Sequence, residues 1–318
     1  MGAEMSTERL ELAITVDTVQ DFGAGRERLL RRLFRDRLAI AGLVLVSFFA
    51  LAALFAPLLA PHDPLAIDPL HRLSGSTGLH PLGTDRLGRD TLSRVLFGAR
   101  WSLGTAAVAT VIVIVIGVLV GTLAGYYGGL LDRVLMWVVD VLLAFPSLIL
   151  YLAIVGTLGP GLRNVMIALI ALSWVSYARV VRGLVLSMRE RGFVRASRIL
   201  GASDRQLMVR HILPNVVQPV VVLASLQMGG LIIALSALGF FGLGVQPPTP
   251  EWGTMVNESR LFLQSHPALM IWPSVAISLT VIGFNLLGDG LRDVLDPRLR
   301  PTTTRRQRRR RKAESSTA

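Results

Sequence analysis

The sequence of 318 residues contains no cysteine, and only one of its 33 Lys and Arg residues is a lysine, Lys312. Without cysteine the chain can form neither a disulfide nor a thiolate metal site, and it has no cysteine nucleophile. A Walker-type phosphate loop requires a lysine directly after its glycine. Lys312 instead follows an arginine in a basic run. We therefore expect no ATPase site in this chain.

Charged residues are also scarce, at 17%, whereas 52% of residues are hydrophobic and the mean hydropathy is +0.56. This composition is typical of a membrane protein. The net charge of +12 does not indicate nucleic-acid binding, because no basic stripe alternates with aromatic residues. The five histidines show no metal-ligand spacing, so we expect no metal site.

Long apolar runs indicate an all-α integral membrane protein. A helix needs about 20 mostly apolar residues to cross about 30 Å of hydrocarbon. The second run is rich in β-branched residues, but in lipid only a helix of this length satisfies its own backbone. The six predicted transmembrane helices are 38–59, 103–124, 134–155, 165–181, 216–240 and 269–287.

The distribution of arginine predicts the orientation of these helices, because positive residues accumulate on the cytoplasmic side. With the N-terminus inside, the inner segments contain 26 of the 33 Lys and Arg residues and the outer segments contain seven. The arginines of the first outer loop are also offset by Asp63, Asp68, Asp85 and Asp90. We predict that both termini are cytoplasmic.

The predicted spans and their orientation divide the chain into five parts. A cytoplasmic N-terminal segment (1–37) precedes the first helix (38–60) and an extracytoplasmic loop (61–101). A core domain (102–290) contains a cytoplasmic loop at 192–214. The tail (291–318) carries a basic run without apolar residues, for which we expect attraction to anionic lipid headgroups and no nucleic-acid role.

The 192–214 loop reads as a helix, a break and a second helix. Gly201 interrupts the first helix, because glycine costs about 1 kcal/mol relative to alanine there. Ser203 and Gln206 have the spacing of a capping box that restarts a helix, and Pro214 suits the first turn of the next one. From these features alone, an ordinary hairpin between two spans and a docking surface for another protein both remain open.

The loop resembles the signature of binding-protein-dependent ABC permeases, which is Glu-Ala-Ala, three residues, Gly, nine residues and Ile-x-Leu-Pro. Here Arg195-Ala196-Ser197 is followed at the same spacing by Gly201 and by His211-Ile212-Leu213-Pro214. Three positions differ from that pattern: Arg195, Ser197 and His211. The residues that the resemblance assigns to ATPase coupling are Arg195, Ala196, Ser197, Gly201, Ala202, Ser203, Asp204, His211, Leu213 and Pro214.

Further stretches are similar to the C-type permeases of dipeptide, oligopeptide and nickel importers. They include Ala56-Pro-Leu-Leu-Ala-Pro-His-Asp-Pro64 and His80-Pro-Leu-Gly-Thr-Asp-Arg-Leu-Gly-Arg-Asp90. The resemblance covers about residues 33–300. It implies the type I (methionine-importer-like) ABC importer fold in the bacterial inner membrane, with no cofactor bound by this chain.

The resemblance also implies the partners. They are a second homologous permease, two cytoplasmic ATPases that use ATP and Mg²⁺, and an extracytoplasmic substrate-binding lipoprotein. Peptides are the favoured cargo, while glutathione and nickel complexes stay open, because in this family the binding protein selects the ligand. The chain itself is expected to have no enzymatic activity.

Several single residues within the spans carry expectations of their own. Asp140 should face protein or water, with Arg179 or Arg182 as its partner, although a substrate contact stays open. Gly117, Gly121 and Gly125 should allow close helix packing. Residues that could line a pathway, or simply pack, are Gly229, Gly230, Ser236 and Gly239.

Two other classes of function, a secondary transporter and an intramembrane enzyme, require features that can be compared with the sequence. A secondary transporter would need inverted repeats or carboxylates that bind coupling ions, and Asp140 is the only acidic residue clearly within a predicted span. An intramembrane enzyme would need a catalytic set, and the sequence offers no cysteine, no paired aspartates and no His-Glu metal motif. Both are less consistent with the sequence than a permease.

Overall fold

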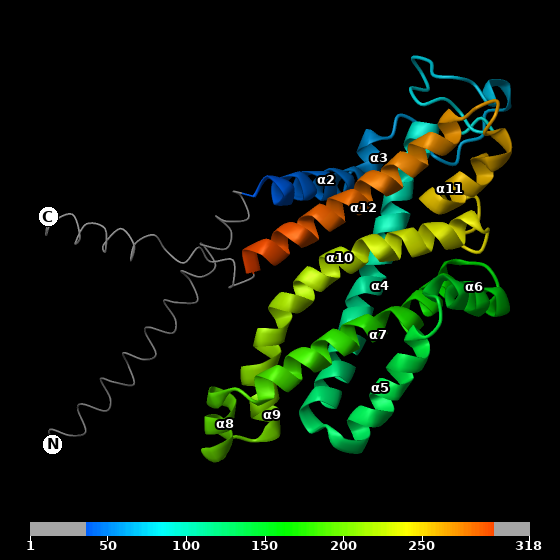
Figure 1. Cartoon of the computed structure of the whole chain (residues 1–318). Helices are drawn as coiled ribbons and strands as arrows, with labels where there is room; N and C mark the ends of the chain where they lie inside the picture. The colour runs from blue at the N-terminus through cyan, green and yellow to red at the C-terminus, as the bar shows by residue number, and fades with distance from the viewer. Residues whose placement is uncertain (1–35, 296–318) are drawn as a thin grey trace, which may run out of the picture.

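The computed structural model describes residues 36–295, and this part of the chain is helical apart from its loops and one isolated bridge between Thr84 and Asp90. The predictions for residues 1–35 and for the basic tail beyond 295 lie outside it. The helices are α2 Arg37–Leu54, α3 Ala56–Leu59, η1 Pro69–His71, α4 Thr91–Tyr127, α5 Gly129–Leu143, α6 Ser147–Leu158, α7 Leu162–Arg189, α8 Gly192–Ile199, α9 Asp204–Gln206, η2 Leu207–Ile212, α10 Leu213–Phe240, α11 Trp252–Ser259, η3 Arg260–Phe262 and α12 Ala268–Leu295 (Figure 1).

Five continuous helical segments of the described chain are long and apolar enough to cross a membrane. They correspond to five of the six predicted spans. The prediction of one helix at 134–155 is wrong, because α5 and α6 meet at a bend of 89°. Pro146 stands at this break, where it lacks an N–H and disfavours the helical conformation of the preceding residue.

Two helix boundaries also differ from those predicted by hydropathy. The first span is divided, since α2 ends at Leu54 and the short α3 follows with a proline in its first turn. α4 begins at Thr91, well before the predicted residue 103, so the last part of the predicted loop 61–101 is helical. The side chain of Asp90 caps this helix by accepting a hydrogen bond from Ser93 N at 2.8 Å. Its first turns contain Arg94 and Arg100, so hydropathy does not detect them.

α4 packs against α7 along a face of small residues. A Cβ added to Gly117 would lie 2.4 Å from Tyr177 Cβ, and one added to Gly121 would lie 2.5 Å from the carbonyl oxygen of Ala178. At Gly125 the nearest atom would be the carbonyl oxygen of Arg182, at 2.8 Å. The predicted packing role of the three glycines is confirmed.

α2 and α12 lie side by side (Figure 1) and approach one another through glycine as well. A Cβ on Gly42 would lie 2.4 Å from the backbone nitrogen of Leu287, and a Cβ on Gly290 would lie 2.3 Å from Ala39 Cβ. Close backbone approach of this kind is a common source of helix association in membranes, where the hydrophobic effect does not drive packing.

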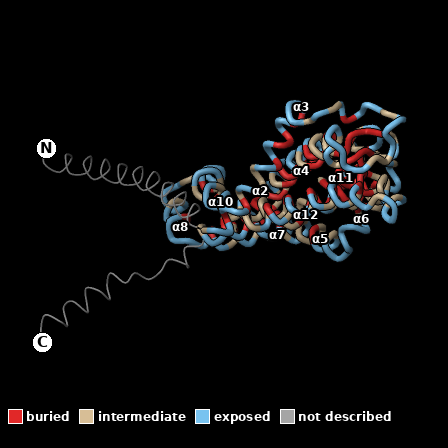
Figure 2. The backbone as a smooth tube through the Cα atoms, turned by 90° about the horizontal axis from the view of Figure 1, so that it is seen from above, coloured by how far each residue is buried: buried red, intermediate tan, exposed pale blue. Residues whose placement is uncertain are grey.

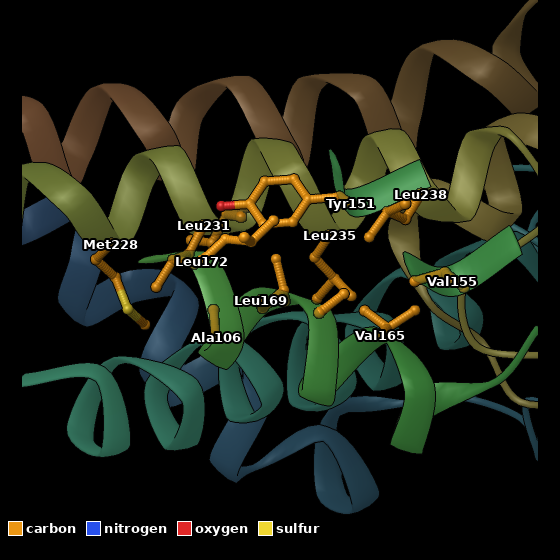
Figure 3. Close-up of a cluster of buried hydrophobic side chains, with 12 residues drawn as sticks. Ala106, Tyr151, Val155, Val165, Leu169, Leu172, Met228, Leu231, Leu235 and Leu238 are labelled. Carbon is orange, nitrogen blue, oxygen red and sulfur yellow. The ribbon is translucent and has the colours of Figure 1, made fainter. Parts of the chain in front are cut away.

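The main apolar core joins α4, α6, α7 and α10 (Figure 3). Tyr151 of α6 lies over Leu172 of α7 and Leu231 of α10, so the short helix after the bend is held against the two long ones. Figure 2 shows that buried residues are plentiful around α4 and α11, whereas α8 at the other end is largely exposed. The 192–214 loop and the α3–α4 loop thus occupy opposite ends of the molecule (Figures 1 and 2).

Candidate functional site

The 192–214 loop consists of helical pieces joined by a sharp turn. α8 is followed by Gly201, whose φ is +87°. Residues with a side chain rarely adopt this conformation, whereas glycine does so without steric cost. A Cβ added there would meet nothing within 4 Å, so the backbone angle and not crowding requires glycine. The predicted break at Gly201 is confirmed.

The second piece starts with the predicted capping box. Ser203 N donates to Gln206 Oε1 at 2.9 Å, and Gln206 N donates to Ser203 Oγ at 3.4 Å. α9 then continues through the π-helical turns of η2 into α10. Pro214 is the second residue of α10 and directly follows these π-helical turns. The sequence did not predict the π-helical turns, which are rare and often occur at functional sites.

The last turn of α4 anchors this loop. Tyr126 donates its hydroxyl hydrogen to Asp204 Oδ1 at 2.5 Å and accepts a hydrogen bond from Arg198 Nη2 at 3.1 Å. Arg189 Nη1 donates to the backbone carbonyl of Tyr126 at 3.0 Å. Val194, which is 1% exposed, packs in the same apolar cluster as the Tyr126 ring. Polar and apolar contacts therefore hold both sides of the turn against α4.

The residues at the tip of the loop are highly exposed. Ile199 is 85% exposed and Leu200 is 87% exposed, although both are apolar. The sequence analysis did not identify this pair. The feature that could have indicated it is the presence of two adjacent aliphatic residues in a polar segment. Of the predicted coupling residues, the structure exposes Arg195, Ala196, Gly201, Ser203, Asp204 and Pro214, and it half-buries Ser197, Ala202, His211 and Leu213. All of them belong to one surface region at the end of the molecule.

Arg195, the most marked departure from the family signature, has a partner within the chain. Its guanidinium forms an ion pair with Glu190, which follows α7. The hydrogen bond from Arg195 lowers the pKa of the Glu190 carboxyl. Both side chains are more than half exposed, so this pair contributes little to stability. It does neutralise part of the positive charge beside α8.

A cavity of about 370 Å³ lies beside the α5–α6 break, lined by residues of α5, α6, α7 and α10. Phe145 of the break contributes to its wall, and so do Gln227 and Gly230 of α10. The hydroxyls of Tyr151 and Ser173 lie 3.0 Å apart in the same lining. The cavity therefore combines an apolar wall with a few polar groups.

The other residues named as possible pathway lining face neighbouring helices. A Cβ on Gly229 would lie 3.4 Å from Val281 Cγ1 of α12, and one on Gly239 would lie 2.6 Å from Glu251 Oε2. The backbone of Ser236 is close to Gly253 of α11, where an added Cβ would lie 2.3 Å from the Ser236 carbonyl oxygen. Only Gly230 of the four is among the residues that line the cavity.

Asp140 of α5 forms an ion pair with Arg179 of α7, as expected. The other predicted candidate, Arg182, instead forms hydrogen bonds through Nε and Nη2 with both carboxylate oxygens of Asp132, at 2.5 and 2.6 Å. The two pairs join α5 to α7 on one side of the molecule. Such pairing lowers the cost of placing charge within an apolar segment.

At the opposite end, two arginines of the predicted outer loop are buried. Arg89 Nε lies 2.6 Å from Asp85 Oδ2, and Arg94 Nη2 lies 2.9 Å from Glu258 Oε2. The sequence predicted that aspartates offset these arginines, and Asp85 does so. Glu258, which follows far later in the chain, was not predicted.

The same end also brings two histidines and an aspartate together. His62, His80 and Asp90 lie close enough to hold a metal ion. Their separation in the sequence follows no familiar metal-ligand spacing, which is why the sequence did not indicate them.

These features define a multi-pass helical membrane protein with one exposed, well-anchored loop at one end. The sequence profile of the family described as "binding-protein-dependent transport system inner membrane component" matches residues 117–301. A second profile, the N-terminal transmembrane domain of oligopeptide transport permease C, matches residues 27–77.

Individual proteins are similar over most of their length. A dipeptide transport system permease of Alkalihalophilus pseudofirmus is 42% identical over 270 residues, which is 85% of this chain and 89% of that protein. A glutathione transport system permease of Pectobacterium atrosepticum is 43% identical over 271 residues, covering 85% and 90%. The corresponding glutathione permease of Escherichia coli O157:H7 is 44% identical over 271 residues, covering 85% and 89%. The chain belongs to the binding-protein-dependent permease family, within its peptide and nickel importer branch.

Proposed function

We propose that this chain is the permease subunit of an ATP-driven importer that carries peptides across the bacterial inner membrane. It forms half of the pathway beside a second homologous permease. Two cytoplasmic ATPases supply the energy, and an extracytoplasmic binding protein delivers the cargo. The similar proteins named above, dipeptide and glutathione permeases, support this assignment. Glutathione is itself a tripeptide, so it is the second candidate cargo.

The exposed tip of the 192–214 loop carries the proposal. Adjacent exposed aliphatic residues on a rigid support are typical of a protein-binding surface, and Ile199 and Leu200 are of this kind. The turn at Gly201 and the hydrogen bonds of Tyr126 fix the direction in which the tip points. A docked ATPase could therefore transmit force through the loop into α4, α7 and α10.

We further infer six crossings with both termini in the cytoplasm. In this topology the bent α5–α6 pair forms one broken crossing, in addition to the five continuous helical segments. The excess of arginine in the inner segments supports it, because that asymmetry matches the positive-inside rule. The loop that we assign to the ATPases is then on the cytoplasmic side. Cysteine-accessibility labelling at position 199 from either side of the membrane tests this topology.

Transport by the assembled complex in vesicles tests the function. We expect import of a labelled dipeptide to require the partner permease, both ATPases, the binding protein and ATP. Import should be insensitive to collapse of the proton gradient. Import by this chain alone under a proton gradient would instead show a secondary transporter. Mass analysis of the ligand carried by the binding protein distinguishes dipeptide from glutathione as cargo.

The tip is tested by charge insertion. Replacement of Leu200 by Asp should abolish co-purification of the ATPases and ATP-driven import. Burial of an unpaired carboxylate in an apolar interface is energetically costly. The control is Leu70→Asp. Leu70 is 90% exposed in η1 of the α3–α4 loop, at the other end of the molecule, and its replacement should leave ATPase binding intact. Equal ATPase binding by the Leu200 variant and the wild type would contradict the docking role.

A further inference from the structure

Three side chains from separate segments converge at the end of the molecule opposite the 192–214 loop. His80 Nδ1 lies 2.9 Å from Asp90 Oδ1, and His62 Nδ1 lies 4.0 Å from the same oxygen. The two imidazole rings are 4.7 Å apart between centroids. One potential ligand atom from each of the three residues lies within 4.8 Å of the others.

The carboxylate of this cluster is deeply buried, since the Asp90 side chain is 0% exposed and that of His80 is 12% exposed. Within residues 36–295, Asp90 forms ion pairs with these two histidines and with no Lys or Arg. A buried carboxylate without a permanent cation is costly. His62 Nδ1 is itself buried and has no hydrogen-bond partner among the described residues. The cluster thus places an imidazole nitrogen that has no hydrogen-bond partner among the described residues beside a carboxylate oxygen that contacts His80 Nδ1.

Ser93 holds two of the three residues in place. Asp90 Oδ2 accepts hydrogen bonds from Ser93 N at 2.8 Å and from Ser93 Oγ at 2.7 Å. Ser93 Oγ in turn accepts a hydrogen bond from His62 N at 3.1 Å. Asp90 Oδ1 therefore remains directed at the histidines. Hydrogen bonds of this kind, which orient ligands from behind, are a regular feature of metal sites.

We propose that His62, His80 and Asp90 form a binding site for a divalent transition-metal ion of the Zn²⁺ type. Two imidazoles and one carboxylate match the ligand preference of Zn²⁺ and leave a fourth position for water. An open groove of about 570 Å³ borders His62, with Trp101 and Pro250 in its lining, and gives an ion access from solvent.

The ion would join three points of the α3–α4 loop. His62 lies near the start of this loop, His80 lies in its second half, and Asp90, its last residue, is the N-cap of α4. Binding therefore fixes the α3–α4 loop against the start of α4. This role is independent of transport, so its test needs no partner subunit.

The test uses the purified full-length chain in detergent after removal of metal with EDTA. Titration with Zn²⁺ by calorimetry should show one ion bound per chain, and thermal unfolding should shift to higher temperature as Zn²⁺ is added. His62→Phe keeps an aromatic ring but removes the ligand nitrogen, and it should weaken binding by about tenfold or more. His62 Nδ1 has no hydrogen bond within the described residues but lies 4.0 Å from Asp90 Oδ1, so the metal-free variant and the metal-free wild type are unfolded side by side, and the effect of Zn²⁺ is measured from each protein's own midpoint.

His266→Phe is the matched control, because His266 lies in a different loop and should leave binding unchanged. Asp90→Asn gives a second variant, since asparagine also caps helices but is a weaker metal ligand. X-ray absorption of the zinc-loaded wild type should show imidazole nitrogen at about 2.0–2.1 Å. Equal Zn²⁺ affinity for the His62 and His266 variants, or no saturable binding by the wild type, would overturn the proposal.

Discussion

Tyr126 and Asp204 are joined by a hydrogen bond of 2.5 Å although they belong to different helices, α4 and α9. The bond closes one side of the 192–214 loop, and Arg198 closes the other by donating to the same hydroxyl. A single phenol thus connects the two residues that flank the Gly201 turn. It is the most direct polar link between the exposed tip and a membrane helix.

Tyr126→Phe should therefore loosen the loop without removing the packing of the ring. Hydrogen bonds to charged groups contribute about 1.5–3 kcal/mol each when they are well formed. We expect faster amide hydrogen exchange at residues 196–206 and reduced ATP-driven import. The control is Tyr127→Phe, since Tyr127 is 52% exposed and its hydroxyl has no hydrogen bond within the described chain. Similar exchange in both variants would show that the tether is unimportant.

Gly201→Ala should strain the turn, because a φ of +87° costs about 1–2 kcal/mol for a residue with a Cβ. Gly192→Ala is the control, since Gly192 lies in α8 and its added methyl also meets nothing within 4 Å. The first change should reduce import several-fold and the second should not. Gly201→Trp should abolish import and ATPase association while the protein remains inserted in the membrane. Normal import by the Trp variant would contradict the assigned role of the loop.

Gly121→Ala should separate α4 from α7. The added methyl would lie 2.5 Å from the carbonyl oxygen of Ala178, and overpacking of this kind costs about 1–3 kcal/mol. Gly104→Ala is the matched control in the same helix, because nothing lies within 4 Å of its added Cβ. Thermal unfolding in detergent should show a lower midpoint for the first variant and an unchanged or higher one for the second.

Glu251 should make stability depend on pH. It is 0% exposed, and its oxygens accept hydrogen bonds from Gly253 N and Thr254 N, each at 2.9 Å. Burial raises the pKa of the Glu251 carboxyl above its ordinary value of 4.5. The folded protein then holds the proton more tightly than the unfolded chain does. The free energy of unfolding should accordingly fall as the pH rises from 4.5 through the folded pKa.

Glu251→Gln should remove this pH dependence, since the amide cannot ionise. Its one oxygen keeps the hydrogen bonds of one carboxylate oxygen, whereas its NH2 group replaces the other oxygen and cannot accept. Glu251→Ala should destabilise the protein at every pH, by about 1–2 kcal/mol, because it removes the cap of α11. Chemical unfolding from pH 4 to 8 compares the three proteins. Parallel curves for the wild type and the Gln variant would show that Glu251 does not titrate in this range.

The sequence predicted the helical spans and the local shape of the 192–214 loop because both depend on short-range chemistry. Hydropathy identifies residues that must leave water, and Gly201, Ser203 and Pro214 act on their own turn of backbone. The bend between α5 and α6 is different. Pro146 indicates a kink, but the angle of the bend also depends on the packing of Tyr151 in the core formed by α7 and α10.

The clusters at the other end could not be predicted for a similar reason. His62, His80 and Asp90 meet only because the loop that contains them folds back on itself. At this fold Gly88 has a φ of +82° and packs against the carbonyl group of Asp68. Likewise, Glu258 reaches Arg94 from a helix that follows much later in the chain. The spacing of residues along the sequence does not show which distant segments come into contact.

The 37 residues of α4 give it a length of about 55 Å, well beyond the roughly 30 Å of a bilayer core. Its first residue follows the buried carboxylate of the histidine cluster, and Tyr126 stands in its last turn. A helix transmits displacement along its axis far better than a loop does. The histidine cluster and the anchor of the 192–214 loop are therefore connected by one continuous helix, and a disturbance at either end should be detectable at the other.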